Sequence, residues 1–108
     1  MNENADICRM KVLITAATHP EIAITQQYLA EKMYLRKDCD VHILLTGVGL
    51  VNTTYALTKY LAKTKPDLVI QAGIGGSLHP FFPPGIVTII KEEIVSEDTI
   101  KNDLFALP

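Results

Sequence analysis

The chain has few cysteines, and their positions exclude the common cysteine-based sites. Cys8 and Cys39 lie far apart and form neither a CxxC redox pair nor a spacing typical of metal ligands. We therefore predict that both are plain reduced thiols, as is usual for a protein of the cytoplasm.

The chain also lacks an excess of positive or negative charge. Lys and Arg total 10 and Asp and Glu total 12, which gives a net charge of -2. Such a chain lacks the basic footprint of a nucleic-acid-binding protein and is poorly suited to anionic membrane surfaces. No apolar run approaches the roughly 18 residues of a membrane-spanning helix. The acidic, polar start at residues 1–6 does not resemble a signal peptide. We expect a cytoplasmic protein with no nucleic-acid or membrane partner.

The amino-acid composition indicates a folded domain. The 108 residues are 48% hydrophobic and 20% charged, which is ordinary for a globular protein and enough for one core. We expect residues 1–9 to form a flexible N-terminal tail before the folded part begins at residue 10.

The order of apolar and helical patterns predicts an α/β fold. The expected strands and helices follow one another as strand, helix, strand, helix, strand, loop and strand, over residues 11–17, 21–34, 41–46, 50–63, 68–72, 73–85 and 86–95. This alternation predicts a three-layer α/β/α architecture with a mostly parallel central sheet. Two helices cover such a sheet thinly, and the chain stops after a polar stretch. We expect an apparently truncated domain with exposed apolar surface, or a partner that supplies the missing cover.

Glycines gather where the expected strands end, which is where ligands bind in open α/β sheets. Gly47-Val48-Gly49 begins like a dinucleotide-binding turn, but Asn52 stands at the sixth position and no acidic ribose partner follows. No P-loop pattern occurs. A tight connection without a ligand stays open for this turn. The loop at residues 73–77 could lay its bare backbone against a flat ring or a sugar, or could be a flexible turn.

Glu21 is the acidic residue with the strongest claim to a role. It follows the first expected strand and should lie at the same edge as the glycine turns. The run Thr18-His19-Pro20-Glu21 also matches a capping box, in which the glutamate caps its own helix. The capping role and a chemical role do not exclude one another.

Other polar residues offer weaker patterns. The three histidines, His19, His42 and His79, share no spacing that would make a metal site, and we predict neither a metal nor a cofactor. His42 lies in an alternating strand and should face solvent or a polar seam. The nucleophile motif G-x-S-x-G is absent. Glu92 and Glu93 are interpreted as edge charges that discourage strand pairing, rather than as a catalytic pair.

Several segments together resemble one known family. Residues 12–21, 46–52 and 66–77, followed by Gly85-Ile86-Val87, resemble in this order the purine nucleoside phosphorylase and nucleosidase superfamily. The resemblance extends from about residue 10 to residue 95. It implies that residues 10–108 are the N-terminal part of a phosphorylase/hydrolase-like domain, that the substrate is a purine nucleoside, and that the protein is a homo-oligomer.

Within the superfamily, the chain looks most like the futalosine hydrolases of menaquinone biosynthesis. The similarity lies in an A-T-x-x-E-I start at Ala17–Ile22 and an A-G-I-x-G-S loop at Ala72–Ser77. Methylthioadenosine/S-adenosylhomocysteine nucleosidases usually carry a serine where this chain has Ile74. Phosphorylases usually add a basic phosphate site, and no Arg or Lys stands in these motifs. These two enzyme types remain as alternatives, as does a non-enzymatic nucleoside-binding or structural remnant.

The resemblance also implies roles for single residues. Glu21 matches the carboxylate that orients and deprotonates the attacking water, and Thr18 belongs to the same substrate-binding motif. Val48 matches a residue on the ribose side of the site. The loop that lies against the nucleoside is matched by Ile74, Gly75 and Gly76. Two features depart from the family: it more often has alanine at Gly75, and its ribose-binding carboxylate and base-protonating aspartate belong to the second half of the domain.

Overall fold

The computed structural model describes residues 9–32 and 38–96 of the chain. It divides the chain into two compact units, Met1–Gly73 and Ile74–Pro108, which are described separately below. Most of the predicted tail, at residues 1–8, lies outside the described residues, as do Cys8 and the end of the first predicted helix. In the described part of the chain, no helix is both long and apolar enough to cross a membrane.

The first unit contains a small parallel sheet. Strand β1 (Met10–Ala16) pairs in parallel with β2 (Cys39–Leu45) on one side and with β3 (Leu68–Gln71) on the other. The strand order is therefore β2-β1-β3, with β1 in the centre. A sheet of three parallel strands joined through helices confirms the predicted α/β fold.

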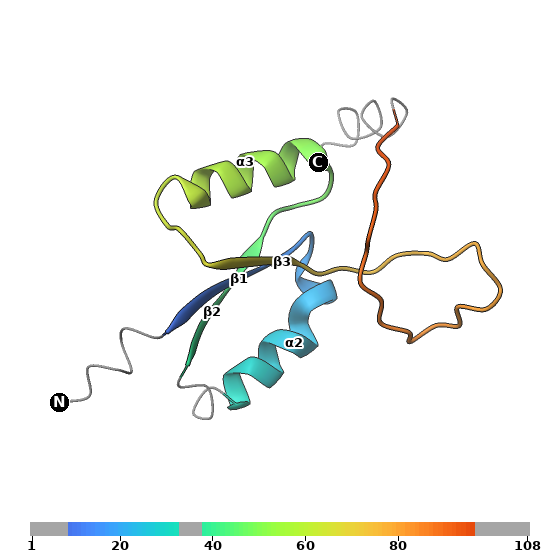
Figure 1. Cartoon of the computed structure of the whole chain (residues 1–108), viewed down its shortest axis with the longest axis horizontal. Coiled ribbons are helices and arrows are strands. Elements are labelled where there is room, and N and C mark those ends of the chain that lie inside the picture. The colour runs from blue at the N-terminus through green and yellow to red at the C-terminus, as the bar shows by residue number, and fades with distance from the viewer. Residues whose placement is uncertain (1–8, 33–37, 97–108) are drawn as a thin grey trace. The chain divides into compact units, whose positions relative to one another are not determined.

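The two helices lie on opposite faces of this sheet, with α2 (His19–Lys32) between β1 and β2, and α3 (Leu50–Leu61) between β2 and β3 in the sequence (Figure 1). The strand order explains this arrangement. The first crossover connection leads from β1 to β2 on one side of it, and the second leads from β2 past β1 to β3 on the other side. Because both crossovers are right-handed, as parallel connections almost always are, their helices fall on opposite faces.

The core is centred on β1, as expected for a strand buried on both faces. Leu13 and Ala16 of β1 are fully or almost fully buried, and Ile22 of α2 is 1% exposed. The edge strand β3 is different, since all four of its residues are exposed. Helix α3 contains no fully buried residue. The exposed apolar surface that the thin helical cover predicts is thus present.

In the second unit, the prediction of a strand at residues 86–95 is wrong. The structure gives these residues no strand pairing, and Val87, Ile89 and Ile94 are more than 85% exposed. A strand needs a neighbour to pair with, and apolar side chains alone do not supply one. The interpretation of Glu92 and Glu93 as charges on a sheet edge falls with that strand, although both side chains are exposed as expected.

Candidate active site at the carboxyl edge of the sheet

The carboxyl ends of the three strands meet at one edge, and backbone hydrogen bonds fix the segments that leave them. The N–H of Thr46 donates to Ala16 O at 2.9 Å, and the N–H of Gly47 donates to Ala17 O at 3.0 Å. On the other side of β1, the N–H of Ala72 donates to Thr15 O at 2.8 Å. The three segments that follow the strands therefore begin side by side.

The carboxylate of Glu21 is held at this edge by Thr18. Its Oε2 accepts a hydrogen bond from the N–H of Thr18 at 3.0 Å and another from the hydroxyl of Thr18 at 2.9 Å. The first bond is the glutamate half of the predicted capping box. The hydroxyl of Thr18 bonds to the carboxylate itself, so Thr18 fixes the orientation of the carboxylate as well as the start of α2.

The other carboxylate oxygen faces a glycine. A Cβ atom built on Gly73 would lie 3.6 Å from Glu21 Oε1, which is an ordinary van der Waals distance. Because Gly73 has no side chain, its backbone can lie close to Glu21 Oε1. The half-buried Glu21 thus has one oxygen bound by Thr18 and a second beside bare backbone.

The turn after β2 is shaped by a backbone requirement. Gly47 has a φ of +82°, and a Cβ atom there would lie only 3.2 Å from Asn52 Cβ. The N–H of Gly47 already donates to Ala17 O. This bond favours the interpretation that Gly47 belongs to a tight connection between strand and helix that needs no ligand. Asn52 closes the turn by donating from Nδ2 to Val48 O at 2.7 Å. Val48 is thereby presented outward, with 64% of its surface exposed.

Thr46 supports the same turn from inside. It is 8% exposed, and its hydroxyl lies 3.0 Å from Gly47 O and 3.4 Å from Ala16 O. The hydroxyl of Thr53 donates to it at 3.4 Å. Buried polar groups of this kind need partners, and here they tie the end of β1 to the start of α3.

The structure therefore brings together only some of the residues that the sequence predicts for the site. Thr18 and Glu21 are in contact, and the turn bearing Val48 is bonded to the segment that leads into Thr18. Ile74, Gly75 and Gly76 belong to the second unit, where they are exposed and where a Cβ atom on either glycine would meet nothing within 4 Å. Their predicted contact with a nucleoside stays a prediction.

Two contributors to the site are not among the residues that the sequence predicts for it. Gly73 and Thr46 lie within the family-like motifs, but the sequence assigns neither of them a role. The signal that could have found both is the parallel register, because residues just beyond the ends of adjacent parallel strands must be neighbours.

The described residues contain no group of three or more His, Cys, Asp or Glu side chains that could hold a metal ion. His42 is exposed, as predicted, with its Nε2 3.3 Å from Asp40 Oδ1. The chemistry available at the carboxyl edge is that of a positioned carboxylate with hydrogen-bond donors around it, which suits binding a hydroxyl or accepting a proton from water.

Comparison with known proteins identifies the superfamily of the chain. Residues 5–106 match the phosphorylase superfamily. A curated relative, the 5'-methylthioadenosine/S-adenosylhomocysteine nucleosidase of Anoxybacillus flavithermus (strain DSM 21510 / WK1), is 28% identical over 100 residues. That alignment covers 82% of this chain and 43% of the relative, so the chain spans less than half of the relative's length. No solved structure matches the chain significantly.

Proposed function

Because this chain belongs to the phosphorylase superfamily, we propose that the protein hydrolyses the N-glycosidic bond of a purine nucleoside. The observation that carries the proposal is the geometry of Glu21. Its Oε2 is held by two donors of Thr18, and its Oε1 lies beside the bare backbone of Gly73. This carboxylate can orient a water molecule at the carboxyl edge of the sheet, in a cytoplasmic enzyme that needs no metal or cofactor for the step.

In the proposed reaction, the bond between the anomeric carbon of ribose and the base nitrogen breaks through an oxocarbenium-like sugar. The oxygen of water bonds to the anomeric carbon, and Glu21 takes the proton that this water releases. The electron pair of the broken bond goes to the base, which leaves after taking up a proton. A positioned carboxylate base contributes roughly 10²- to 10⁴-fold to such a rate.

Water is proposed as the nucleophile rather than phosphate. The described residues just beyond the strand ends at this edge, Thr18, Thr46, Gly47, Val48 and Gly73, include no Lys or Arg. A phosphate would need cationic or densely packed N–H donors to offset its charge. We expect base release to proceed in phosphate-free buffer at the rate seen with phosphate.

For the substrate, we propose futalosine, a 6-oxopurine nucleoside of menaquinone biosynthesis. The support is the resemblance of Ala17–Ile22 and Ala72–Ser77 to the motifs of futalosine hydrolases, with Ile74 in place of a serine. A second candidate is a 6-aminopurine nucleoside such as methylthioadenosine, which the name of the 28% identical relative favours.

The test is release of free base by the protein expressed from its complete reading frame, so that any residues beyond Pro108 are present. Futalosine and methylthioadenosine are compared, with and without phosphate. Faster release of hypoxanthine from futalosine in phosphate-free buffer is the expected result. Preference for methylthioadenosine would replace the proposed substrate, and strict dependence on phosphate would identify a phosphorylase. Tight nucleoside binding without any base release would indicate a nucleoside-binding protein rather than an enzyme.

A further inference from the structure

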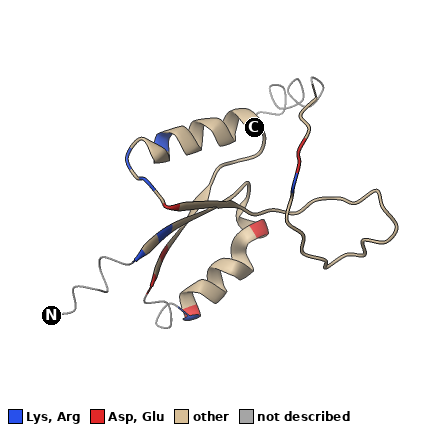
Figure 2. Cartoon of the chain, viewed as in Figure 1, with Lys and Arg blue, Asp and Glu red and all other residues tan. Residues whose placement is uncertain are grey.

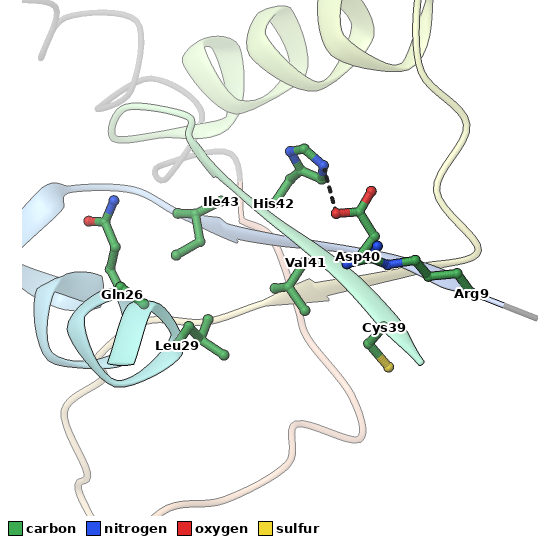
Figure 3. Close-up of a pocket in the computed structure, with 9 residues that line it drawn as sticks. Arg9, Gln26, Leu29, Cys39, Asp40, Val41, His42 and Ile43 are labelled. Atoms are coloured by element: carbon green, nitrogen blue, oxygen red, sulfur yellow. Dashed lines mark ion pairs between the residues drawn. The ribbon is translucent and has the colours of Figure 1, made fainter. Parts of the chain in front are cut away.

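Strand β2 is an edge strand of the described sheet, and an open cavity runs along it. The cavity has a volume of about 270 Å³ and is lined by the β2 residues 39–43, by Arg9 and by Gln26, Leu29 and Ala30 of α2 (Figure 3). Side chains of both faces of β2 line it, which locates the cavity at the strand's outer edge. It lies toward the start of β2 and is distinct from the carboxyl edge that holds Glu21.

The backbone hydrogen bonds show which residues of β2 turn their polar groups outward. The N–H of Met10 donates to Asp38 O, and the N–H of Thr46 donates to Ala16 O. In a parallel pair these bonds place the even-numbered residues of β2 toward β1. The N–H and C=O groups of Cys39, Val41 and Ile43 therefore point away from β1. Such an edge is a template for pairing with another strand.

The side chains along this edge are complementary to themselves. If two copies of β2 pair antiparallel about a two-fold axis at Val41, Asp40 of each copy lies opposite His42 of the other. Val41 then lies opposite its own counterpart as a hydrogen-bonded pair, and Cys39 lies opposite Ile43. Asp40 and His42 occupy a non-hydrogen-bonded pair, where side chains are closest, so that an imidazole N–H of His42 can donate to the carboxylate of Asp40.

The two sides of the edge suit this arrangement. Asp40 and His42 project from one face of β2, with a contact of 3.3 Å between them, and both remain partly exposed, at 39% and 58% (Figure 3). On the other face, Val41 and Ile43 line the cavity with Leu29 and Ala30 of α2. The apolar side chains of an incoming β2 would lie against the part of the cavity formed by Leu29 and Ala30, while the Asp–His pairs form on the other face of the joined sheet.

From these observations we propose that the occupant of the β2 edge is β2 of a second copy of this chain, which pairs antiparallel about Val41 and joins two three-stranded sheets into one. A two-fold contact of this kind uses the same surface on both partners. This interface does not depend on the proposed nucleosidase function.

The backbone part of the proposal is tested by Val41→Pro, with Val41→Thr as the matched control. The N–H of residue 41 takes no part in the bond pattern with β1, so proline there leaves the internal ladder intact and is tolerated as on other edge strands. In sedimentation velocity of the full-length protein, wild type and Val41→Thr are expected to dimerise, and Val41→Pro to dissociate at least tenfold more readily. A wild type that stays monomeric at several hundred micromolar contradicts the proposal, as does a Val41→Pro dimer of unchanged affinity.

The charge pairing is tested by exchange. His42→Asp places carboxylates opposite carboxylates, and Asp40→His places imidazoles opposite imidazoles, so both single variants should weaken the dimer. The double variant Asp40→His/His42→Asp restores one of each type in every pair and should regain the dimer. If the loss of dimer affinity in the double variant equals the sum of the losses in the single variants, Asp40 and His42 do not face one another.

The register is tested by a single cysteine in a cysteine-free background. A hydrogen-bonded antiparallel pair has its Cα atoms about 5.5 Å apart, within the range that a disulfide spans. Val41→Cys is therefore expected to form a disulfide-linked dimer under mild oxidation. Leu45→Cys is not, because in this register residue 45 lies far from its counterpart in the other copy. Equal cross-linking of both variants would overturn the register, and a dimer with no cross-link at residue 41 would assign the interface to another surface.

Discussion

At the residue scale, the candidate site depends on which positions carry no side chain. Gly73 leaves space beside Glu21 Oε1, and its backbone has no positive φ that would by itself require glycine. Gly47 does have a positive φ and is crowded by Asn52. The two glycines therefore have different reasons for being glycine: one leaves space beside the carboxylate, and the other permits the turn.

This difference predicts that Gly73→Ala keeps the fold and loses activity. The added methyl group would lie 3.6 Å from Glu21 Oε1, which the protein accommodates without strain but which displaces water or substrate from that oxygen. We expect kcat/KM for base release to fall roughly 10- to 100-fold, because small misplacements at a reacting centre have effects of this size. The melting temperature should stay within about 2 °C of wild type. Gly73→Val should lower the rate further, and an alanine variant of full activity would remove Gly73 from the site.

The opposite outcome is expected for Gly47→Ala, which should destabilise the fold. A left-handed conformation costs a residue with a Cβ atom about 1–2 kcal/mol, and the 3.2 Å approach to Asn52 Cβ adds to this cost. Urea denaturation should show a loss of at least that size. Gly75→Ala is the control, since a Cβ atom there meets nothing within 4 Å, and its stability should equal that of wild type.

At the element scale, the start of α2 serves two purposes at once. The bonds from Thr18 to Glu21 Oε2 close the first turn of the helix and hold the carboxylate in one orientation. The charge distribution is consistent with this, because Glu21 lies in the first turn of α2 and Lys32 in the last, where each stabilises the helix dipole (Figure 2).

Removal of the Thr18 hydroxyl should therefore lower activity as well as stability. Thr18→Ala loses one hydrogen bond to a charged group, worth about 1.5–3 kcal/mol, while the backbone N–H of residue 18 still donates to Glu21. We expect kcat for base release to fall about tenfold or more. Thr18→Ser keeps the hydroxyl and should recover most of the rate. Equal rates for the alanine and serine variants would show that the hydroxyl does not position the carboxylate.

The three strands should contribute unequally to stability. Leu13 of the central strand is fully buried, so Leu13→Ala is expected to cost about 2–5 kcal/mol of unfolding free energy. Leu45, at the end of an edge strand, is 46% exposed, and Leu45→Ala should cost well under half as much. Chemical denaturation of the two variants in parallel measures the ratio. Similar losses would mean that the core is not centred on β1.

At the scale of the whole molecule, local pattern predicted most of the first unit. The run at residues 11–17 predicts β1 correctly, because β-branched and apolar residues on both faces suit a central parallel strand. Helix α3 ends at Leu61, close to its predicted limit at residue 63. The strand expected at 86–95 did not form, since an apolar run specifies burial but not the partner that provides it. The approach of Gly73 to Glu21 also needed the register between β1 and β3, which no single segment contains.

The hydrolytic role of Glu21 is tested most directly by Glu21→Gln, compared with Glu31→Gln on the same helix. A glutamine at 21 can still accept the hydrogen bonds of Thr18 but takes up a proton from water far less readily. Glu31 is exposed, and its Oε1 accepts a hydrogen bond from Gln27 Nε2 at 3.2 Å. In phosphate-free buffer, kcat for base release should fall by about 10²- to 10⁴-fold in Glu21→Gln and stay unchanged in Glu31→Gln. Unchanged turnover in Glu21→Gln would contradict the proposed mechanism.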